Sequence, residues 1–407
     1  MPLSYPQLRE LLSAERLPAV VVDLDALDRN LDRVLALVRP SGVPLRVASK
    51  SVRVVAVLRR LLERGDGLLR GLLCFAVEEA EFLAGEGFDD LLVAYPAWQR
   101  LDLRRVAKLT GDGVRIALMC DCRAAIDRVS AVADAHRVTI PVVLCVDMSL
   151  RLARGRVFLG VRRSPLFAPE QVVELARYAE SRPGVKLHGL MGYEAQVAGV
   201  GDESPFEPWL NPVKALIRRK SVTEVAARRG AMVAALREAG FSLELVNGGG
   251  TGSLDSTTAC PEVTEVTAGS AFFKPHLFDY YRNPHVKQLQ PACFFALEVT
   301  RKPADDLVTC LGGGYVASGP AGADKVPLPW LPAGLELLRD EMCGEVQTPL
   351  RVPRGVELGL GDPVIFRHAK AGELNERFNE VLLVQDGAIV RVVSDLCCAR
   401  RGNERDV

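Results

Sequence analysis

Residues 222–253, VTEVAARRGAMVAALREAGFSLELVNGGGTGS, show the pattern from which the architecture follows. In the first part, apolar side chains recur at three- and four-residue spacing and charged side chains occupy the other face, which is typical of an amphipathic helix. A short apolar run, LELV, comes next and ends in a glycine-rich turn. This stretch therefore predicts a helix followed by a buried strand.

The same alternation extends over about residues 19 to 270, where short Val/Leu/Ile-rich runs alternate with helix-like segments such as LDRNLDRVLALVR. Near-continuous apolar strands between helices indicate a parallel sheet that is buried on both faces. Eight such units follow the first run, VVVDL, and fit a TIM-type (β/α)₈ barrel of about 250 residues. A doubly wound open sheet is the alternative, but PLRVASKSVR has no glycine where a dinucleotide fingerprint would lie.

The pattern changes after about residue 285, where β-rich runs are separated by Gly/Pro turns. The tetrapeptide QDGA between two apolar runs predicts a hairpin. We therefore predict a barrel domain over residues 15–284 and an all-β domain over residues 285–400, on which the extreme N-terminus is able to pack.

Composition and charge exclude several classes of function. The 407 residues carry 51 Lys+Arg and 51 Asp+Glu, and this neutral balance argues against a nucleic-acid-binding surface. No stretch approaches the ~20 apolar residues of a membrane span, and the N-terminus lacks the apolar run of a secretory signal. Ten cysteines without such a signal favour reduced thiols in a cytoplasmic protein. Only Cys120 and Cys122 have metal-site spacing, and no second pair completes a zinc site.

Two features suggest chemistry at the barrel mouth. Lys50 ends the first barrel strand, LRVASK, at the end where barrels place catalytic residues. By position alone it is more simply a solvated lysine that starts the next helix. However, glycine-rich turns follow strands seven and eight, at 247–253 and 268–270, where barrels bind phosphate through backbone N–H groups. A lysine opposite a phosphate site suits a phosphate-bearing aldehyde cofactor, which forms a Schiff base with the amine.

The opening LPAVVVDLD, the strand-one lysine, MGYEAQ, NGGGTG, TAGS and the later RHAK together resemble the fold-type III pyridoxal-phosphate enzymes. Within that group the chain is similar to the D-threonine aldolase / D-serine dehydratase branch, and to bacterial proteins described as amino-acid deaminase/aldolase. The resemblance runs from about residue 17 to residue 393. It implies that Lys50 carries the cofactor and that the phosphate is bound by Gly249, Gly250, Thr251, Gly269 and Ser270.

The resemblance also implies roles for residues that follow strands five and six. Tyr193 should lie beside the cofactor ring, with Gln196 as a further cofactor contact; the alternative for Tyr193 is plain packing at the barrel top. Arg151 or Arg154 should reach the cofactor's phenolic oxygen or the substrate carboxylate. Ser149 stands where the family pattern often has glycine, so the choice between the two arginines stays open, as does a surface ion-pair role for either.

His368, in FRHAK, matches the point at which the family places a metal-binding histidine in its second domain. The residue two positions later, a Cys or Asp ligand in the family, is Lys370 here, and a protonated amine cannot bind a metal. Either the metal is absent, with Lys370 supplying the charge and His368 acting as base, or Glu373, Cys397 or Cys398 provides a replacement ligand. We favour the first interpretation.

The resemblance implies a homodimer in which one subunit's β-domain completes the partner's site, and the loop 315–325, with Asp324 as its acidic residue, is the segment expected there. The alternative for this loop is a plain solvent-exposed connection. The expected activity is aldol cleavage of β-hydroxy-α-amino acids of D-threonine type. Dehydration of D-serine-like substrates is the alternative, and racemisation, with Tyr315 as a second acid/base, is a weaker one. A non-catalytic pyridoxal-phosphate-binding protein is disfavoured because such proteins usually lack a second domain.

Overall fold

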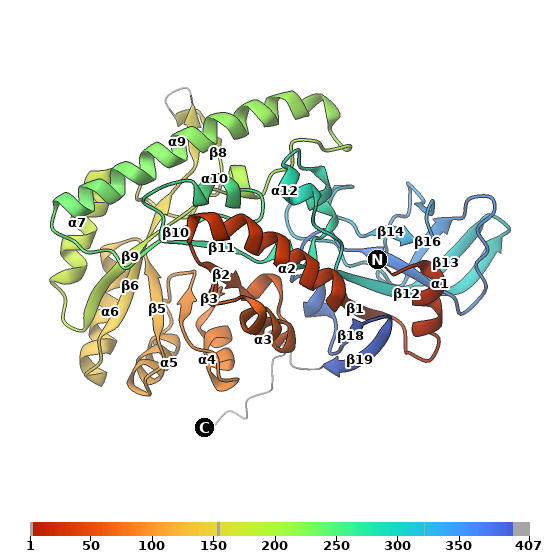
Figure 1. Cartoon of the computed structure of the whole chain (residues 1–407), viewed down its shortest axis with the longest axis horizontal. Helices are drawn as coiled ribbons and strands as arrows, with labels where there is room; N and C mark the ends of the chain where they lie inside the picture. The colour runs from red at the N-terminus through yellow and green to blue at the C-terminus, as the bar shows by residue number, and fades with distance from the viewer. Residues whose placement is uncertain (1–2, 153–154, 321, 394–407) are drawn as a thin grey trace.

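A computed structural model describes residues 3–152, 155–320 and 322–393, and it contains a closed barrel beside a large sheet (Figure 1). All eight barrel strands are parallel, and β11 pairs with β2 to close the ring. The predicted (β/α)₈ barrel is confirmed, and its strands are the eight apolar runs that follow VVVDL. They are β2 (Leu45–Ala48), β3 (Leu69–Cys74), β4 (Leu91–Val93), β5 (Ile116–Cys120), β6 (Ile140–Asp147), β9 (Val185–Tyr193), β10 (Leu245–Gly248) and β11 (Glu265–Ala268).

Helices surround the barrel and cover the outer face of its strands (Figure 1). The predicted helix over residues 222–240 is part of a much longer helix, α9, which begins at Asn211 and ends at Glu238. A short hairpin of β7 (Leu150–Leu152) and β8 (Val157–Leu159) interrupts the pattern after β6. The helices are α2 (Leu24–Val38), α3 (Val55–Arg64), α4 (Val77–Gly85), α5 (Arg100–Gly111), α6 (Arg123–His136), α7 (Pro169–Glu180), α8 (Ala195–Ala198), α9, α10 (Leu254–Thr258), α11 (Ser270–Phe273) and α12 (Pro284–Lys287).

The second part of the molecule is a nine-stranded sheet that is antiparallel except where β1 pairs with β18. Its main path runs β15-β16-β13-β12-β1-β18-β19, and β17 joins β12 to β14. The strands are β1 (Ala19–Asp23), β12 (Cys293–Ala304), β13 (Leu307–Leu311), β14 (Leu328–Leu331), β15 (Glu336–Leu337), β16 (Gln347–Arg351), β17 (Pro363–Arg367), β18 (Val381–Gln385) and β19 (Ala388–Val393). The predicted hairpin is confirmed, because Asp386 and Gly387 both have the positive φ of a type I′ turn between β18 and β19.

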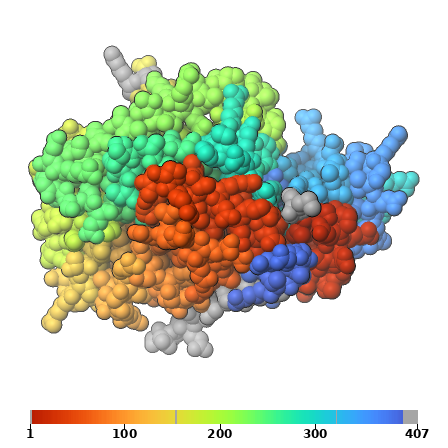
Figure 2. Space-filling view, in the orientation of Figure 1, coloured from red at the N-terminus to blue at the C-terminus, as the bar shows by residue number. Residues whose placement is uncertain are grey.

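Strand β1 shows how the two parts are joined. It lies within the range 15–284 that we assigned to the barrel, yet it pairs with β12 and β18 in the middle of the second sheet. A continuous apolar run such as VVVDL is typical of any strand that is buried on both faces. Its pattern therefore could not show whether this strand belongs to the barrel or to the second sheet. The helix α1 (Tyr5–Leu11) packs Leu8 on the same sheet, and Figure 2 shows the red N-terminal surface beside the blue surface of the C-terminal strands.

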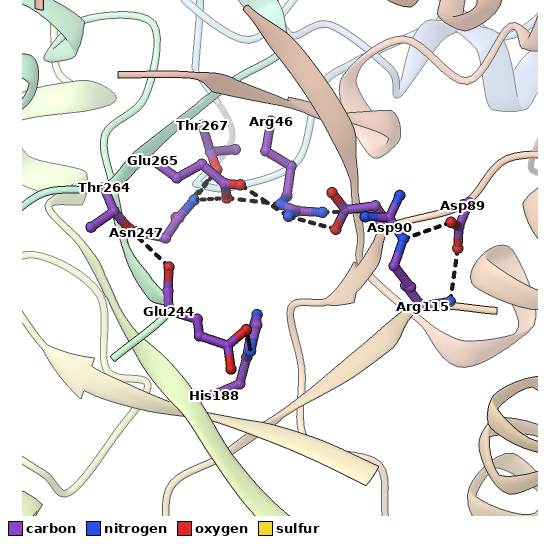
Figure 3. A network of polar contacts seen from close by, with 10 residues as sticks. All are labelled: Arg46, Asp89, Asp90, Arg115, His188, Glu244, Asn247, Thr264, Glu265 and Thr267. Carbon is purple, nitrogen blue, oxygen red and sulfur yellow. Dashed lines mark hydrogen bonds and ion pairs between the residues drawn. The ribbon is translucent and has the colours of Figure 1, made fainter. Parts of the chain in front are cut away.

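A polar network fills the part of the barrel interior below the mouth (Figure 3). Arg46 donates to both carboxylate oxygens of Glu265, at 2.8 and 2.9 Å, and its Nη2 also reaches Asp90 at 2.8 Å. Asn247 donates to Glu265 Oε1 at 2.7 Å and to Thr267 Oγ1 at 2.8 Å. Glycine is needed at position 71, because a Cβ there would overlap the Arg46 guanidinium. The network connects strands β2, β10 and β11 and keeps the buried charges paired.

No helix in the described ranges combines the length and the apolar character that crossing a membrane requires.

The buried Arg46–Glu265 pair gives a stability prediction. Arg46→Met leaves the Glu265 carboxylate buried without its cation, so we expect a loss of about 3–5 kcal/mol in the free energy of unfolding. Arg115→Met is the matched control, because the Arg115–Asp89 pair in the same view is exposed and should contribute less than about 1 kcal/mol. Urea unfolding of the three proteins measures both changes, and equal losses in the two variants would contradict the prediction.

Candidate functional site

A cavity opens at the carboxyl ends of the barrel strands, where the sequence predicted the site. Its lining comes mostly from the ends of β2, β3, β4, β9, β10 and β11 and from the turns that follow them, together with Arg163 from the loop after β8. The cavity brings together most of the cofactor-binding residues expected from the sequence, namely Lys50, Tyr193, Gly249, Gly250, Thr251, Gly269 and Ser270.

Lys50 sits in a single turn of 3-10 helix, Ser49–Ser51, just past the end of β2. Its side chain is accessible from the cavity mouth but has protein on most sides. Burial lowers the pKa of the Lys50 ammonium, and the nearby Arg163 guanidinium lowers it further. The lower pKa increases the fraction of unprotonated amine, which is the nucleophilic form.

Glu79, on α4, supports the lysine from behind. Its carboxylate accepts hydrogen bonds from Ser49 Oγ at 2.9 Å and from the Phe75 backbone N–H at 2.7 Å. Burial raises the pKa of Glu79, while these two donors and the nearby cations oppose that rise. Glu79 therefore ties the turn that carries Lys50 to the start of α4.

Tyr193 is the last residue of β9, and its side chain lines the cavity. Burial raises the pKa of its phenol, so the hydroxyl is protonated at neutral pH. The Arg163 guanidinium lies 5.0 Å from the centroid of the Tyr193 ring and 5.4 Å from that of Tyr95. These cation–π contacts fix a positive charge at the mouth of the cavity.

The turns after β10 and β11 need glycine for reasons of space. Gly249 has φ +92°, and a Cβ at Gly250 would lie 2.7 Å from the Ala198 Cβ. A Cβ at Gly269 would lie 2.8 Å from the Ala48 carbonyl oxygen. The backbone N–H groups of Gly250 and Thr251 donate to no acceptor in the described part of the chain. Two unpaired amides beside a cavity are a suitable binding site for an anion.

Two further residues that sequence reasoning missed lie directly behind the first turn. Glu194 accepts a hydrogen bond from the Gly249 backbone N–H at 3.2 Å, and Arg229 lies 3.9 Å from its carboxylate. Arg229 lies on the buried face of α9, between Val225 and Met232. A charged residue among the apolar positions of an amphipathic helix is the sequence signal by which this buried arginine could have been found. No comparable signal marked Arg163, because an irregular loop separates it from its hairpin.

Other predicted residues do not line the cavity. Arg151 pairs with Asp147 at 2.5 Å and packs 3.9 Å from the centroid of the Phe167 ring. Gln196 is buried and donates to the Met148 carbonyl at 2.7 Å, so it supports the loop after β6. Arg154 lies outside the described residues. Among the described arginines after strand five, Arg163 is therefore the one that lines the cavity.

His368 and Lys370 line a second cavity, and the segment 50–53 lines both cavities, the first through Lys50 and Ser51 and the second through Arg53. Burial lowers the pKa of His368 to about 3, and neither ring nitrogen has a hydrogen-bond partner among the described residues. Lys370 donates to the Ser318 carbonyl at 2.6 Å. The two cavities are close to each other. Gly372, which lies between Lys370 and Glu373 of the second cavity, packs so tightly on the backbone of Lys50 that a Cβ at position 372 would overlap the Lys50 carbonyl oxygen.

Comparison with known proteins places this arrangement in a family. The model of the alanine racemase N-terminal domain matches residues 22–276, which include the whole barrel. The chain belongs to the alanine racemase N-terminal domain family. Its match begins inside β1 and ends in the 3-10 helix His276–Tyr280, so most of the second sheet lies beyond it.

Proteins similar to this alanine racemase-like chain include curated aldolases and solved structures that share its fold. The 3-hydroxy-D-aspartate aldolase of Paracoccus denitrificans (strain Pd 1222) is 27% identical over 256 residues, which are 63% of this chain and 60% of that protein's length. The D-threonine aldolase from Filomicrobium marinum has a TM-score of 0.78 at 20% identity, covering 95% of this chain and 96% of that one. The D-threo-3-hydroxyaspartate dehydratase from Delftia sp. HT23 has a TM-score of 0.74 at 20% identity, covering 95% and 99%. These structures share the fold along nearly the whole chain.

The charge of Arg163 gives a prediction about Lys50. Arg163→Leu removes a cation that disfavours the protonated amine, so the pKa of Lys50 should rise and its reaction with a small aldehyde should shift to higher pH. The measurement is the pH profile of Lys50 modification by an aldehyde followed by borohydride reduction and mass spectrometry. In the wild type we expect a midpoint below the ordinary ~10.4 of lysine.

Arg162→Leu is the control, because Arg162 is exposed and packs on the Phe158 ring at 4.4 Å rather than in the cavity. A profile that stays unchanged in Arg163→Leu, or moves equally in both variants, would contradict the assignment.

Proposed function

We propose that the chain is a pyridoxal-phosphate-dependent aldolase that cleaves the Cα–Cβ bond of β-hydroxy-α-amino acids of D-threonine type. The observation that carries the proposal is Lys50, with its lowered pKa, facing two glycine turns across one cavity. The family match and the aldolases among the relatives support the same reading. The D configuration comes from the names of those relatives alone.

The residues present fit pyridoxal phosphate. Lys50 offers the amine for the aldehyde, and the unpaired amides of Gly250 and Thr251 offer donors for the phosphate. Tyr193 offers an aromatic face and Ser270 a further polar contact. When bound, the cofactor accepts the electron pair that is left on Cα when a bond to that carbon breaks.

Arg163 is our candidate for binding the substrate carboxylate or the cofactor's phenolic oxygen, the role that the resemblance gave to Arg151 or Arg154. Its guanidinium is the cation that lines the Lys50 cavity, whereas Arg151 is committed to Asp147. A guanidinium held between two aromatic rings keeps its donors aimed at one place.

The reaction moves one proton from oxygen to carbon. The proton leaves the β-hydroxyl, the Cα–Cβ bond breaks to give the aldehyde, and Cα takes a proton to give glycine. We assign the proton that reaches Cα to Lys50 Nζ, because burial and Arg163 make its ammonium more acidic than that of an ordinary lysine. The Tyr193 hydroxyl, protonated at neutral pH, orients the substrate by hydrogen bonding.

The described residues do not fit a divalent metal at His368. No group of three His, Cys, Asp or Glu side chains with metal-binding geometry occurs among them. Both carboxylate oxygens of Glu373 are taken by Ser318, at 2.7 and 2.6 Å, and Lys370 donates to the same serine. Cys397 and Cys398 lie outside the described residues. We propose that the Lys370 ammonium stands in for the metal charge and that neutral His368 accepts the hydroxyl proton.

Two alternatives remain as different outcomes of the same assay. Dehydration is favoured by the likeness to the dehydratase fold, but the departure of hydroxide needs a strong acid or a metal at that oxygen. Racemisation needs a second acid/base. Tyr315, the candidate for it, lines the same second cavity as His368, and its ring centroid lies 5.1 Å from that of Phe295 and 5.3 Å from that of Phe378.

We further propose a cytoplasmic homodimer with shared sites. The loop 315–325 is the segment we expect at the partner's cavity mouth, and within it Asp324 is paired with Lys325.

Product analysis tests the proposed reaction. The protein loaded with pyridoxal phosphate should convert D-threonine to acetaldehyde and glycine, and Lys50→Ala should reduce the rate ~10²-fold or more. An oxoacid with ammonia would establish dehydration instead, and the opposite enantiomer alone would establish racemisation. Arg162→Leu, on the exposed loop, serves as a variant that keeps the activity.

Chelation tests the role of Lys370. Treatment with EDTA followed by gel filtration should leave the aldol activity unchanged, because the Lys370 side chain is a permanent part of the site. Lys370→Met should lower the activity, and adding Mn²⁺ or Zn²⁺ should not restore it. An ion bound in stoichiometric amount and required for turnover would refute this reading.

A further inference from the structure

Glu194 is buried behind the turn Gly249–Ser253, which we call the glycine turn. It directly follows Tyr193, and successive side chains of an extended chain point to opposite sides. Tyr193 therefore lines the cavity, whereas Glu194 points to the back of the glycine turn, and only 3% of its side chain is exposed.

The carboxylate of Glu194 accepts three hydrogen bonds, two from the glycine turn and one from α10. Oε2 accepts from the Gly249 backbone N–H at 3.2 Å. Oε1 accepts from Ser253 Oγ at 3.0 Å and from Thr257 Oγ1, at the end of α10, at 2.5 Å. Hydrogen bonds to an ionised acceptor are stronger than neutral ones, so this clamp restricts the shape of the turn. With the Gly249 amide used in this way, the next two amides are left for a ligand.

A carboxylate behind an anion site would repel the anion if its charge were not balanced. Arg229, of which 1% is exposed, places Nη1 3.9 Å from Glu194 Oε2 and bonds Glu262 through Nε at 3.1 Å. Burial acts against the charged guanidinium, but Glu194 and Glu262 raise the pKa of Arg229 above its ordinary value. Arg229 is therefore charged, and it offsets the carboxylate that shapes the turn.

We propose that Glu194 is a positioning residue that sets the selectivity of the cavity for a phosphorylated aldehyde over its unphosphorylated form. Glu194 holds the glycine turn so that the Gly250 and Thr251 amides converge on the phosphate, and Arg229 removes the electrostatic penalty. This inference rests on the proposed function, because it takes the occupant of the cavity to be pyridoxal phosphate.

The test compares the dissociation constants of pyridoxal 5′-phosphate and pyridoxal, which both react with Lys50 and differ only in the phosphate. Cofactor absorbance measures both constants in the wild type, Glu194→Leu and Glu194→Gln. Glu194→Leu removes all three acceptor contacts, so the preference for the phosphorylated form should fall about tenfold or more. A Gln amide can accept from the Gly249 N–H and donate to the two hydroxyls, so Glu194→Gln should keep the preference within about threefold.

Asp362→Leu is the matched control. This buried carboxylate also accepts from a glycine amide, Gly359 N–H at 2.6 Å, but it lies just before β17 of the second sheet and does not line the Lys50 cavity. Asp362→Leu should reduce stability and leave the ratio of the two constants unchanged. If Glu194→Leu does not fold, Thr257→Val removes only the 2.5 Å contact and should lower the ratio in the same direction by a smaller factor.

The possible failures are distinct. An unchanged ratio in Glu194→Leu, or in Thr257→Val, would overturn the inference while leaving the proposed function intact. A wild type that binds neither compound through Lys50, or binds them equally, would overturn the proposed function at its cofactor.

Discussion

Pairing between β11 and β2 is the interaction on which the rest of the structure depends. It closes the barrel with Ala268 opposite Val47, so the residues that follow these two strands meet at the mouth. Lys50 and Ser270 therefore share one cavity, although 219 positions separate them in the chain. The backbones come so close that Gly269 has no room for a Cβ beside the Ala48 carbonyl. Closure, rather than any local motif, brings the Lys50 amine into one cavity with the unpaired amides of Gly250 and Thr251.

Two buried ion pairs lie next to the barrel mouth. Arg46 and Glu265 lie below the cavity, and Glu194 and Arg229 lie behind the glycine turn. Each pair is nearly inaccessible to solvent. Such pairs contribute little stability over apolar packing, but removing one partner leaves a buried charge that destabilises the fold strongly. Thr267 links the lower network to the cavity, since it lines the mouth and hydrogen-bonds Asn247. The positions of the lysine and of the turns are thus set by polar contacts from below and behind.

Much of the fold was predictable, because eight apolar runs between amphipathic helices admit few architectures. Lys50, Tyr193 and the glycines were also predictable, since chemistry at a barrel concentrates at strand ends. The arginine that lines the cavity was not predictable. Arg163 follows the β7–β8 hairpin, whose length changes the expected distance from strand five, and the two arginines that we expected, Arg151 and Arg154, come before it. The second sheet was predicted only in part, since short strands such as Glu336–Leu337 carry too few residues for a periodic signal. Glu194 lies within the MGYEAQ motif, but its contacts are with the glycine turn, which is more than fifty residues away in the sequence.

The position of β1 has a consequence for synthesis of the chain. Val20 pairs with Phe295 on one side and with Val381 on the other, so both partners of this strand are made long after it. All eight barrel strands are synthesised before β12 and β18 exist. Until then β1 is an apolar strand with two unpaired edges, which is the kind of segment that chaperones bind and that pairs with other chains. Strand β1 can therefore acquire both of its neighbours only after nearly the whole described chain has been made, and a nascent chain that stops short of residue 381 leaves one edge of β1 open.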